Sequence, residues 1–438
     1  MNHAVTLDKE KCKGCTTCIK HCPMGAIRVR NGLAHILDER CIDCGVCIKV
    51  CPHKAKKAVC DSLERLSEFE YNIALPAPSL YGQFHNLEDI NVVLQGLLDI
   101  GFDWLYEVSK GAEIISSVTR QYIVSEKDTP RPLISSACPT VVRLISMRFP
   151  KLLPNIITLI APFEVAAMNA RREAALRTGL SADKIGVFFI TPCPAKVTAG
   201  RYPLLMEKPV VDGVISMAEV YKKILLAMKK IKNPPQLSQS GAMGIGWAHS
   251  GGESSALPQK QSISVDGVDN VINILEDLEN GVLLQVDFLE LNACNQGCVG
   301  GCLTVENPYI AQSNIKHLME SLPASSPKME MGKELLLELR GEKPLQYSPT
   351  LKLDDDRAVA MKKFVRIEAL TQKLAGLDCG SCGAPSCRAL AEDIVLGHAS
   401  EDDCIFRLRE KMQKLTGSSE ANEYLPPPFR KREENEEN

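Results

Sequence analysis

The sequence has no excess of charge of either sign. Its 438 residues include 51 Lys and Arg against 54 Asp and Glu, which gives a net charge of -3. A balanced surface has no general attraction for polyanions, so nucleic acid is not expected as a partner. Hydrophobic residues make up 45% and charged residues 24% of the chain. These shares are those of an ordinary globular protein, and they exclude wholesale disorder and fibrous classes.

Segments that would direct the chain into or across a membrane are also missing. Met1–Glu10 is polar and lacks the apolar stretch of a secretory signal. The most apolar region, Leu152–Met168, is interrupted by Pro154, Pro162 and Glu164. A membrane span needs about 20 predominantly apolar residues, so this region is not expected to be one. We therefore expect a cytoplasmic protein with no membrane partner, in which thiols stay reduced.

Cysteine is the residue that the chain has in unusual number, with 18 copies. Reduced cysteines at this density more often bind metals or perform redox chemistry than form disulfides. At about 150 residues per domain, the length predicts about three domains. The predicted boundaries are 1–65, 66–330, 331–420 with a proline-containing linker at its start, and a disordered tail at 421–438.

The first cysteine group contains an internal repeat. The run C-x2-C-x2-C-x3-C-P occurs twice, which is the signature of bacterial two-cluster ferredoxins. In that signature, three cysteines of one run and the fourth of the other hold each 4Fe-4S cluster. Zinc is the alternative, but a zinc site closes with four ligands and does not need three cysteines within seven residues, twice. The predicted ligand sets are Cys12, Cys15, Cys18 and Cys51 for one cluster, and Cys41, Cys44, Cys47 and Cys22 for the other.

The middle region alternates short apolar runs with amphipathic stretches. Tyr71–Leu75 is followed by Leu87–Ile100, and Ile185–Thr191 by Ala218–Ile231. Short strand-like runs between helical segments predict an α/β domain. Three further runs follow the same pattern and precede cysteines or helices: Phe102–Val108, Pro132–Ser136 and Leu283–Leu291.

Three segments of this region place cysteine beside proline or glycine. Cys138 follows the run Pro132–Ser136, Cys193 follows Ile185–Thr191, and the last segment follows Leu283–Leu291. Thiols at strand ends can converge on one crevice, where four of them could hold a cluster. Buried structural thiols are the alternative, because unpaired cysteine is among the most buried residue types. The last segment carries Cys294, Cys298 and Cys302.

The third cysteine group lies near the C-terminus. Three cysteines in a loop rich in Gly and Pro could ligate one face of a metal site, and a helix at Arg388–Leu396 could return the chain to the fourth. Zinc is an alternative metal for this set. The stretch resembles the small 4Fe-4S domain of corrinoid iron-sulfur proteins and of the B subunit of membrane electron-transport complexes, which implies iron. The predicted ligands are Cys379, Cys382, Cys387 and Cys404.

The three middle segments resemble the signature motifs of iron-iron (FeFe) hydrogenases, T-S-C-C-P, M-P-C-x-x-K and E-x-M-A-C-x-x-G-C-x-G-G. The resemblance implies an α/β hydrogenase-type catalytic domain with an N-terminal two-cluster ferredoxin domain and a small C-terminal iron-sulfur domain. It also implies an H-cluster, which is a 4Fe-4S cube joined through Cys298 to a diiron unit with carbonyl, cyanide and dithiolate ligands. Lys196 would hold one cyanide. The implied ligands are Cys138, Cys193, Cys294 and Cys298, and the implied pocket residues are Pro78, Ser79, Ser250 and Gly251.

The chain departs from this family where protons usually move. The family's proton-relay cysteine is replaced by Ala137, and the matching helix positions Val118–Tyr122 contain no carboxylate. A thiol of suitable pKa can relay a proton, whereas a methyl group cannot. Two methionines of the motifs are Thr191 and Asn292 here. Cys302 is a candidate replacement relay, although a packed and inert thiol is the simpler interpretation, and we interpret Cys60 as structural.

These features predict reversible cleavage of dihydrogen to protons and electrons with low turnover, because loss of a general acid or base typically costs 100- to 10,000-fold in rate. They resemble the sensory branch of the family, so we expect a dihydrogen or redox sensor with three 4Fe-4S clusters and the H-cluster. Expected partners are dihydrogen and protons, ferredoxin or another redox partner, hydrogenase maturation proteins, and a signalling kinase or phosphatase. The alternative is a non-catalytic, Narf-like iron-sulfur protein without a diiron unit.

Overall fold

The computed structural model describes residues 3–126, 128–257, 261–282, 285–324 and 333–416. The chain divides into two compact units. The larger contains residues 1–12 and 36–350, and the smaller contains residues 13–35 and 351–438. The predicted tail, 421–438, lies entirely outside the described residues. The domain boundaries given above remain predictions.

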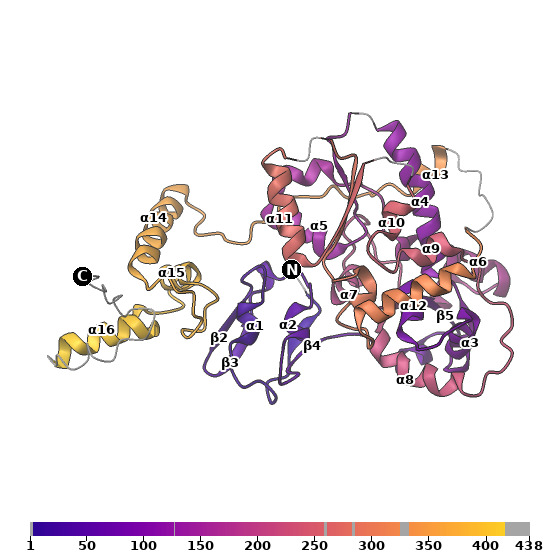
Figure 1. Cartoon of the computed structure of the whole chain (residues 1–438), viewed down its shortest axis with the longest axis horizontal. Coiled ribbons are helices and arrows are strands. Elements are labelled where there is room, and N and C mark those ends of the chain that lie inside the picture. Colours follow the sequence, from indigo (N-terminus) through magenta and orange to yellow (C-terminus); the bar gives the residue numbers. More distant parts are fainter. Residues whose placement is uncertain (1–2, 127, 258–260, 283–284, 325–332, 417–438) are drawn as a thin grey trace, which may run out of the picture. The chain divides into compact units, whose positions relative to one another are not determined.

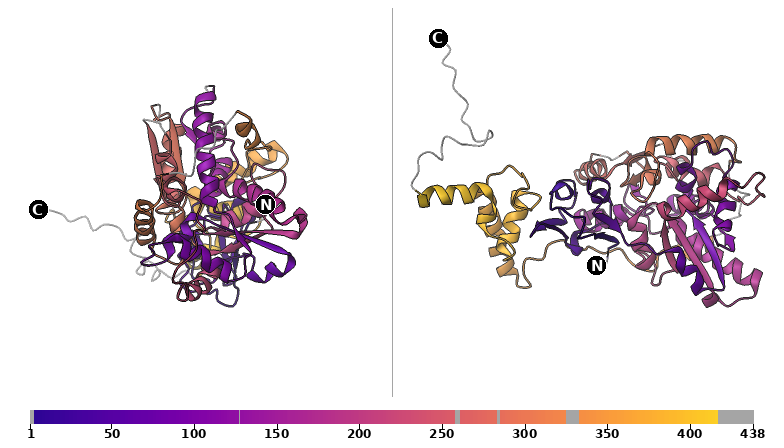
Figure 2. Two further views of the ribbon diagram at one scale, coloured as in Figure 1. Left: turned by 90° about the vertical axis from the view of Figure 1, so that its right-hand side faces the viewer. Right: turned by 90° about the horizontal axis from the view of Figure 1, so that it is seen from below.

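The larger unit contains two parallel sheets, and β5 of the four-stranded one is labelled in Figure 1. In the four-stranded sheet, β5 and β8 pair along their length and are buried at nearly every position. Continuous burial is typical of parallel strands covered on both faces. Figure 2 shows these strands side by side in its right-hand view. The sheet order is β6 (Trp104–Leu105), β5 (Tyr71–Pro76), β8 (Ile185–Thr191) and β9 (Gly213–Ser216).

The second sheet is smaller and also parallel. Its central strand β11 (Phe288–Asn292) pairs with β10 (Ser262–Asp266) and β7 (Leu133–Ile134). A separate antiparallel pair joins β1 (Val5–Leu7) to β4 (Lys56–Ala58).

Helices alternate with these strands, as the α/β prediction requires. The larger unit has α2 (Val46–Lys49), α3 (Ile90–Asp99), α4 (Val108–Ser125), α5 (Pro139–Arg148), α6 (Pro162–Thr178), α7 (Pro194–Arg201), α8 (Met217–Met228), α9 (Ala242–Gly246), α10 (Gly252–Ser255), α11 (Val268–Glu279), α12 (Pro308–Glu320) and α13 (Lys333–Glu338). The α/β fold class is confirmed.

Individual boundaries differ from the predictions. The predicted strand Phe102–Val108 forms only the two-residue β6, and its last residue, Val108, begins α4. The predicted run Leu283–Leu291 forms β11 from Phe288 onward, and its first two residues lie outside the described ones. The predicted strand Ile185–Thr191 is β8.

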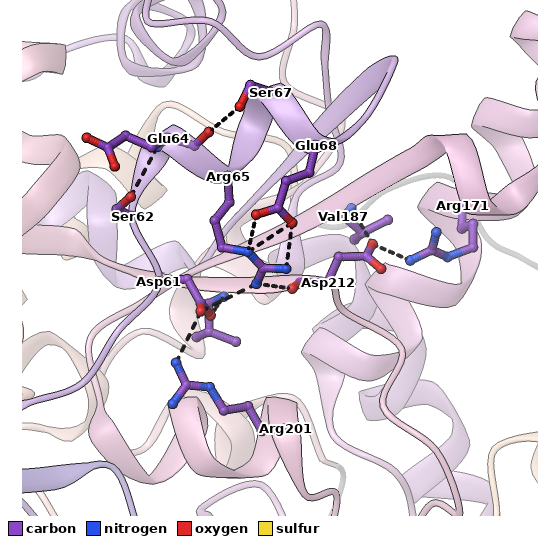
Figure 3. Close-up of polar contacts among 11 residues, drawn as sticks. Asp61, Ser62, Glu64, Arg65, Ser67, Glu68, Arg171, Val187, Arg201 and Asp212 are labelled. Atoms are coloured by element: carbon purple, nitrogen blue, oxygen red, sulfur yellow. Dashed lines mark hydrogen bonds and ion pairs between the residues drawn. The ribbon is translucent and has the colours of Figure 1, made fainter.

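An ion pair and hydrogen bonds tie the segment after the cysteine repeats to α7 and to residues in and beside β9 (Figure 3). Asp61 accepts hydrogen bonds from Arg201 Nη2 at 3.2 Å and from the backbone N–H of Val214 at 2.8 Å. Arg65 donates to the backbone oxygen of Asp212 at 2.6 Å. Because Arg201 is the last residue of α7, these contacts fix the helix that begins after Cys193.

The smaller unit combines part of the first cysteine run with the C-terminal residues. Ile367, Leu370 and Leu390 are among the side chains of its own buried core. The helix predicted at Arg388–Leu396 is α15, one residue earlier at each end. The elements are α1 (Thr17–Lys20), β2 (Ile27–Arg30), β3 (Leu33–Ile36), α14 (Arg357–Lys373), α15 (Cys387–Val395) and α16 (Ile405–Thr416).

Candidate functional site

The four predicted H-cluster ligands lie at the carboxyl ends of parallel strands. Cys138 and Cys193 are the N-cap residues of α5 and α7, and a proline occupies the first turn of each helix. Proline suits this position because its missing N–H would have no partner there. Cys294 and Cys298 follow β11 in the loop that forms a short 3-10 helix at Gly297–Gly300.

The charges of these thiols act on one another. Burial raises the pKa of Cys138, Cys193 and Cys294. The charges of neighbouring thiols contribute to each shift: Cys298 acts on Cys138, Cys138 acts on Cys193, and Cys193 acts on Cys294. A buried thiolate is unfavourable without a positive group nearby, so this set suits a metal cluster.

Lys196, in the first turn of α7, is the cation at this site. Its Nζ donates a hydrogen bond to Cys298 Sγ at 3.3 Å. Burial opposes the charge on Lys196, but the negative charges of Cys298, Cys193 and Cys138 outweigh burial and raise the pKa of the ammonium. Lys196 therefore stays protonated, as a donor to an anionic ligand must.

Lys196 and Cys298 face a cavity whose empty volume is about 600 Å³, part of it open to solvent. Pro78, Ser79 and Ala137 also line it. Apolar side chains form much of the remaining wall, which would limit access of water to a bound group. These include Val108, Ala112, Pro162, Phe163, Phe189 and Trp247.

Ser250 and Gly251 contact the ligand loop through the backbone. The N–H of Ser250 donates to Gln296 O at 3.2 Å, and that of Gly251 donates to Glu290 Oε1 at 2.9 Å. Gly297 has φ of +78°, and a side chain there would place Cβ 2.5 Å from Ser250 N. This close approach requires glycine and fixes the loop that carries Cys294 and Cys298.

Two buried carboxyl groups on the cavity wall, Glu253 and Glu290, did not emerge from the sequence. Glu253 Oε2 accepts a hydrogen bond from Ser135 Oγ at 2.7 Å. The same hydroxyl oxygen accepts from the N–H of Ala137 at 3.1 Å. Burial first, and the charge of Glu290 second, raise the pKa of Glu253 to about 8. The signal that could have revealed them is their adjacency to segments already of interest, Ser250–Gly252 and Asn292–Cys302.

Glu290 accepts hydrogen bonds from several groups, most of them in the segment Gly251–Ser254. It accepts hydrogen bonds from the backbone N–H groups of Gly251 and Ser254, from the Ser254 hydroxyl at 2.8 Å, and from Asn292 Nδ2 at 3.0 Å. Glu290 and Glu253 thus have different environments on the same wall.

A buried aspartate connects the second cysteine run to two helices of the site. Asp43 Oδ2 accepts from Arg143 Nη1 at 2.9 Å and from Thr198 Oγ1 at 2.6 Å. Its other oxygen accepts from the N–H groups of Ala4 at 3.0 Å and Val5 at 3.2 Å. Arg143 and Thr198 belong to α5 and α7, so one carboxylate joins the Cys41–Cys44 loop to the helices that begin after Cys138 and Cys193.

Cys302 packs at the same junction. A Cβ at Gly45 would lie 2.3 Å from Cys302 Sγ, so only glycine fits there, and Gly45 also has φ of +73°. Lys49 donates a hydrogen bond to the backbone oxygen of Gly300. Burial raises the pKa of the Cys302 thiol, and that of Cys60 to about 12. Both therefore remain uncharged, as packed thiols do.

The ferredoxin-type cysteines show matching local geometry in both runs. The N–H of Ala26 donates to Cys22 Sγ and that of Ala55 donates to Cys51 Sγ, each at 3.3 Å. Gly14 has φ of +62°, which an L side chain rarely adopts. None of the 18 cysteines forms a disulfide. How the two runs share ligands remains a prediction.

The C-terminal cysteines converge. Cys379, Cys382, Cys387 and Cys404 all line one cavity with an empty volume of about 330 Å³. Four thiols around one space are the donor set of a 4Fe-4S site or of tetrahedral zinc.

Among the described residues, none of the helices combines the length and apolar character that a membrane span requires.

Comparison with protein families gives three matches. Residues 70–260 and 253–302, together more than half of the chain, match "Iron only hydrogenase large subunit, C-terminal domain". Residues 4–52 match a 4Fe-4S dicluster domain. Residues 374–406 match a family described as an Fe-S cluster domain.

Similar individual proteins belong to the same group. Iron hydrogenase 1 of Clostridium pasteurianum is 23% identical over 254 residues, which are 48% of this chain and 44% of that protein. The chain therefore matches less than half the length of this relative. An FeFe-hydrogenase structure from Chlamydomonas reinhardtii shares 16% identity over 66% of this chain and 98% of that chain, with a TM-score of 0.48. A structure reporting stepwise H-cluster assembly shares 15% identity over 65% of this chain and 98% of that chain, also with a TM-score of 0.48.

Proposed function

Because the chain belongs to the family of iron-only hydrogenase large subunits, we propose that it holds an H-cluster and cleaves dihydrogen reversibly and slowly. The proposed ligands are the four cysteines at the strand ends. The observation that carries the proposal is the Lys196 ammonium, which faces the cavity at 3.3 Å from Cys298 Sγ. Buried thiols alone would suit any cluster, whereas a protonated lysine beside an empty volume suits an additional anionic group there.

The residues present fit the proposed group. Three of the four thiols have raised pKa values because they are buried, so a cation is needed to stabilise their thiolates. Lys196 supplies a donor on one side of the cavity, and Pro78 and Ser79 form another part of its wall. The diiron unit, when bound, would supply the splitting of dihydrogen into a proton and a hydride equivalent.

The protein's own part in this chemistry is to position, to exclude water and to move protons. Ala137 lines the cavity at the place of the usual relay cysteine and cannot carry a proton. The positions Val118–Tyr122 lie within α4 and contain no carboxylate. Glu253 is the group on the wall that can take over, because a pKa of about 8 makes both of its forms accessible near neutral pH. The loss of the usual relay thiol and carboxylates is the reason for the proposed low turnover.

We further propose that the other cysteine groups hold three 4Fe-4S clusters for single electrons, and that ferredoxin or another redox partner exchanges electrons with them. Slow turnover combined with an added C-terminal domain suits a cytoplasmic dihydrogen or redox sensor, coupled to a signalling kinase or phosphatase. Maturation proteins would supply the diiron unit.

The test is reconstitution of the purified chain with a synthetic diiron cofactor, followed by infrared spectroscopy. We expect carbonyl and cyanide bands that change when dihydrogen is added. Cys298→Ser is the control, because it removes the thiolate that would join the diiron unit. If the wild-type chain shows no such bands while its iron content accounts for the cubic clusters, the non-catalytic iron-sulfur alternative is correct.

A further inference from the structure

The C-terminal cysteine loop contacts β2, the strand that follows the first cysteine run. The smaller unit joins residues 13–35 with residues 351–438. The N–H of Val29, in β2, donates to Gly383 O at 2.7 Å. Arg30 Nη1 donates to the carbonyl oxygen of Cys382, also at 2.7 Å. Gly383 has φ of +79°, and a Cβ there would lie 2.0 Å from Val29 O, so only glycine allows this contact.

A buried carboxylate completes the contact. Asp393 in α15 is 7% exposed, and its Oδ2 accepts from Arg28 Nε at 2.7 Å and from Arg30 Nη2 at 2.8 Å. Arg28 is 4% exposed. Removing one partner of a buried ion pair leaves an uncompensated charge, so this cluster is sensitive to substitution. Because α15 begins at Cys387, Asp393 positions a helix that carries a predicted ligand.

The same loop also lies along the short helix of the first cysteine run. A Cβ at Gly380 would be 3.3 Å from Lys20 Cε and 3.5 Å from Ile19 Cδ1. Both residues belong to α1, which contains Cys18. A Cβ at Gly25 would be 3.5 Å from Pro385 Cγ. The loop with Cys379 and Cys382 is thus packed beside the segment that carries Cys15, Cys18 and Cys22.

We infer that Arg28, Arg30 and Asp393 are positioning residues that hold the C-terminal cysteine loop beside the segment with Cys15, Cys18 and Cys22, so that the proposed C-terminal iron-sulfur site is a fixed neighbour of these ferredoxin-type ligands. The C-terminal domain then forms one unit with residues 13–35. Such placement suits exchange of single electrons, in which one site is oxidised, the other is reduced, and no bond forms or breaks. The inference rests on the proposed iron-sulfur occupancy but not on the diiron unit.

The experiment uses the full chain with its iron-sulfur sites and without the diiron unit. After reduction, electron paramagnetic resonance should show splitting or broadening from magnetic interaction between neighbouring sites. Cys404→Ser, which removes one C-terminal ligand, should lose the part of this interaction that comes from the C-terminal site. Asp393→Asn should weaken or abolish that same part while the iron content stays at the wild-type value. Glu368→Gln is the matched control, because it removes an exposed carboxylate of the same domain, paired with Arg388.

Two results would overturn the inference. In the first, the splitting and broadening of the wild-type spectrum are the same as those of Cys404→Ser. In the second, Asp393→Asn keeps its full iron content and the wild-type splitting and broadening. If Asp393→Asn loses iron, Arg30→Gln decides, since it keeps the Arg28–Asp393 pair but removes the bond to Cys382 O. Retained iron with a weakened interaction supports the inference, and retained iron with an unchanged interaction refutes it. None of these readouts involves dihydrogen, so failure of the hydrogenase proposal would leave them interpretable.

Discussion

Replacing Glu253 with glutamine tests whether its carboxyl group moves protons at the cavity. The side chain is 6% exposed, lines the cavity and accepts a hydrogen bond from Ser135 Oγ at 2.7 Å. Glutamine keeps an oxygen that can accept this bond, so the change removes the titrating proton and little else. Loss of a positioned general acid or base typically lowers the rate 100- to 10,000-fold. We expect dihydrogen turnover by the reconstituted Glu253→Gln chain to fall by at least 100-fold.

The same substitution should change how stability depends on pH. The pKa of Glu253 rises from 4.5 to about 8 in the folded protein, chiefly through burial. Between these values the folded state binds a proton that the unfolded state has released, so stability falls as pH rises through this window. The slope is about 1.4 kcal/mol for each pH unit and ends near pH 8. Glutamine cannot titrate, so the difference between wild type and variant should show this slope.

The assays are dihydrogen evolution as a function of pH and denaturant unfolding from about pH 5 to pH 9. Glu164→Gln is the matched control. Glu164 is also a buried carboxyl group whose pKa burial raises, to about 7, but it faces a second cavity of about 320 Å³. Its amide variant should keep the wild-type rate. Wild-type turnover and an unaltered pH profile in Glu253→Gln would refute the role of Glu253 in proton transfer. Equal losses of rate in both variants would show that the loss does not depend on the cavity that Glu253 lines.

Three further substitutions have defined outcomes. Ala137→Cys restores a thiol on the cavity wall and should raise dihydrogen evolution tenfold or more if the missing thiol alone limits turnover; an unchanged rate would place the block further along the proton path. Lys196→Met removes the donor to Cys298 Sγ and should abolish the infrared response to dihydrogen while leaving the cubic-cluster iron in place, and a normal response would contradict the role of the ammonium. Asp43→Asn leaves the buried Arg143 without its ion pair and should lower the free energy of unfolding by about 3–5 kcal/mol in denaturant titrations, whereas a change below about 1 kcal/mol, the range of exposed pairs, would contradict it.

The parts of the site that could be predicted from sequence are those whose chemistry forces a local spacing. The ferredoxin-type 4Fe-4S clusters take several thiolates from within a few residues, so their cysteine runs can be recognised in the sequence. In the C-terminal set, the sequence predicts that a helix returns the chain to Cys404, and Cys404 lines the same cavity as Cys379, Cys382 and Cys387. Strand β8 was likewise predictable, since seven consecutive apolar or small residues indicate a strand covered on both faces.

The acids could not be predicted, because a carboxylate in a sequence looks the same whether it faces solvent or a cavity. Asp43, Glu253 and Asp393 become significant only when folding brings them to partners far along the chain. Asp393 and Arg28 are 365 positions apart, and no periodic pattern links them. Long-range polar contacts of this kind leave no local signal, and only the fold shows which buried charges are paired.

Substitution of Ser135 tests the pKa shift of Glu253 without changing the carboxyl group itself. Its hydrogen bond lowers the pKa of Glu253, against the larger raising effect of burial and the further effect of the Glu290 charge. Ser135→Ala removes a donor that stabilises the carboxylate, so the pKa should move above its present value and the pH profile of turnover should shift to higher pH. Ser136→Ala is the control, because that hydroxyl donates to Leu159 O at 2.8 Å and its loss should leave the profile in place. A shift to lower pH in Ser135→Ala, or none, would mean that the titration limiting turnover does not belong to Glu253.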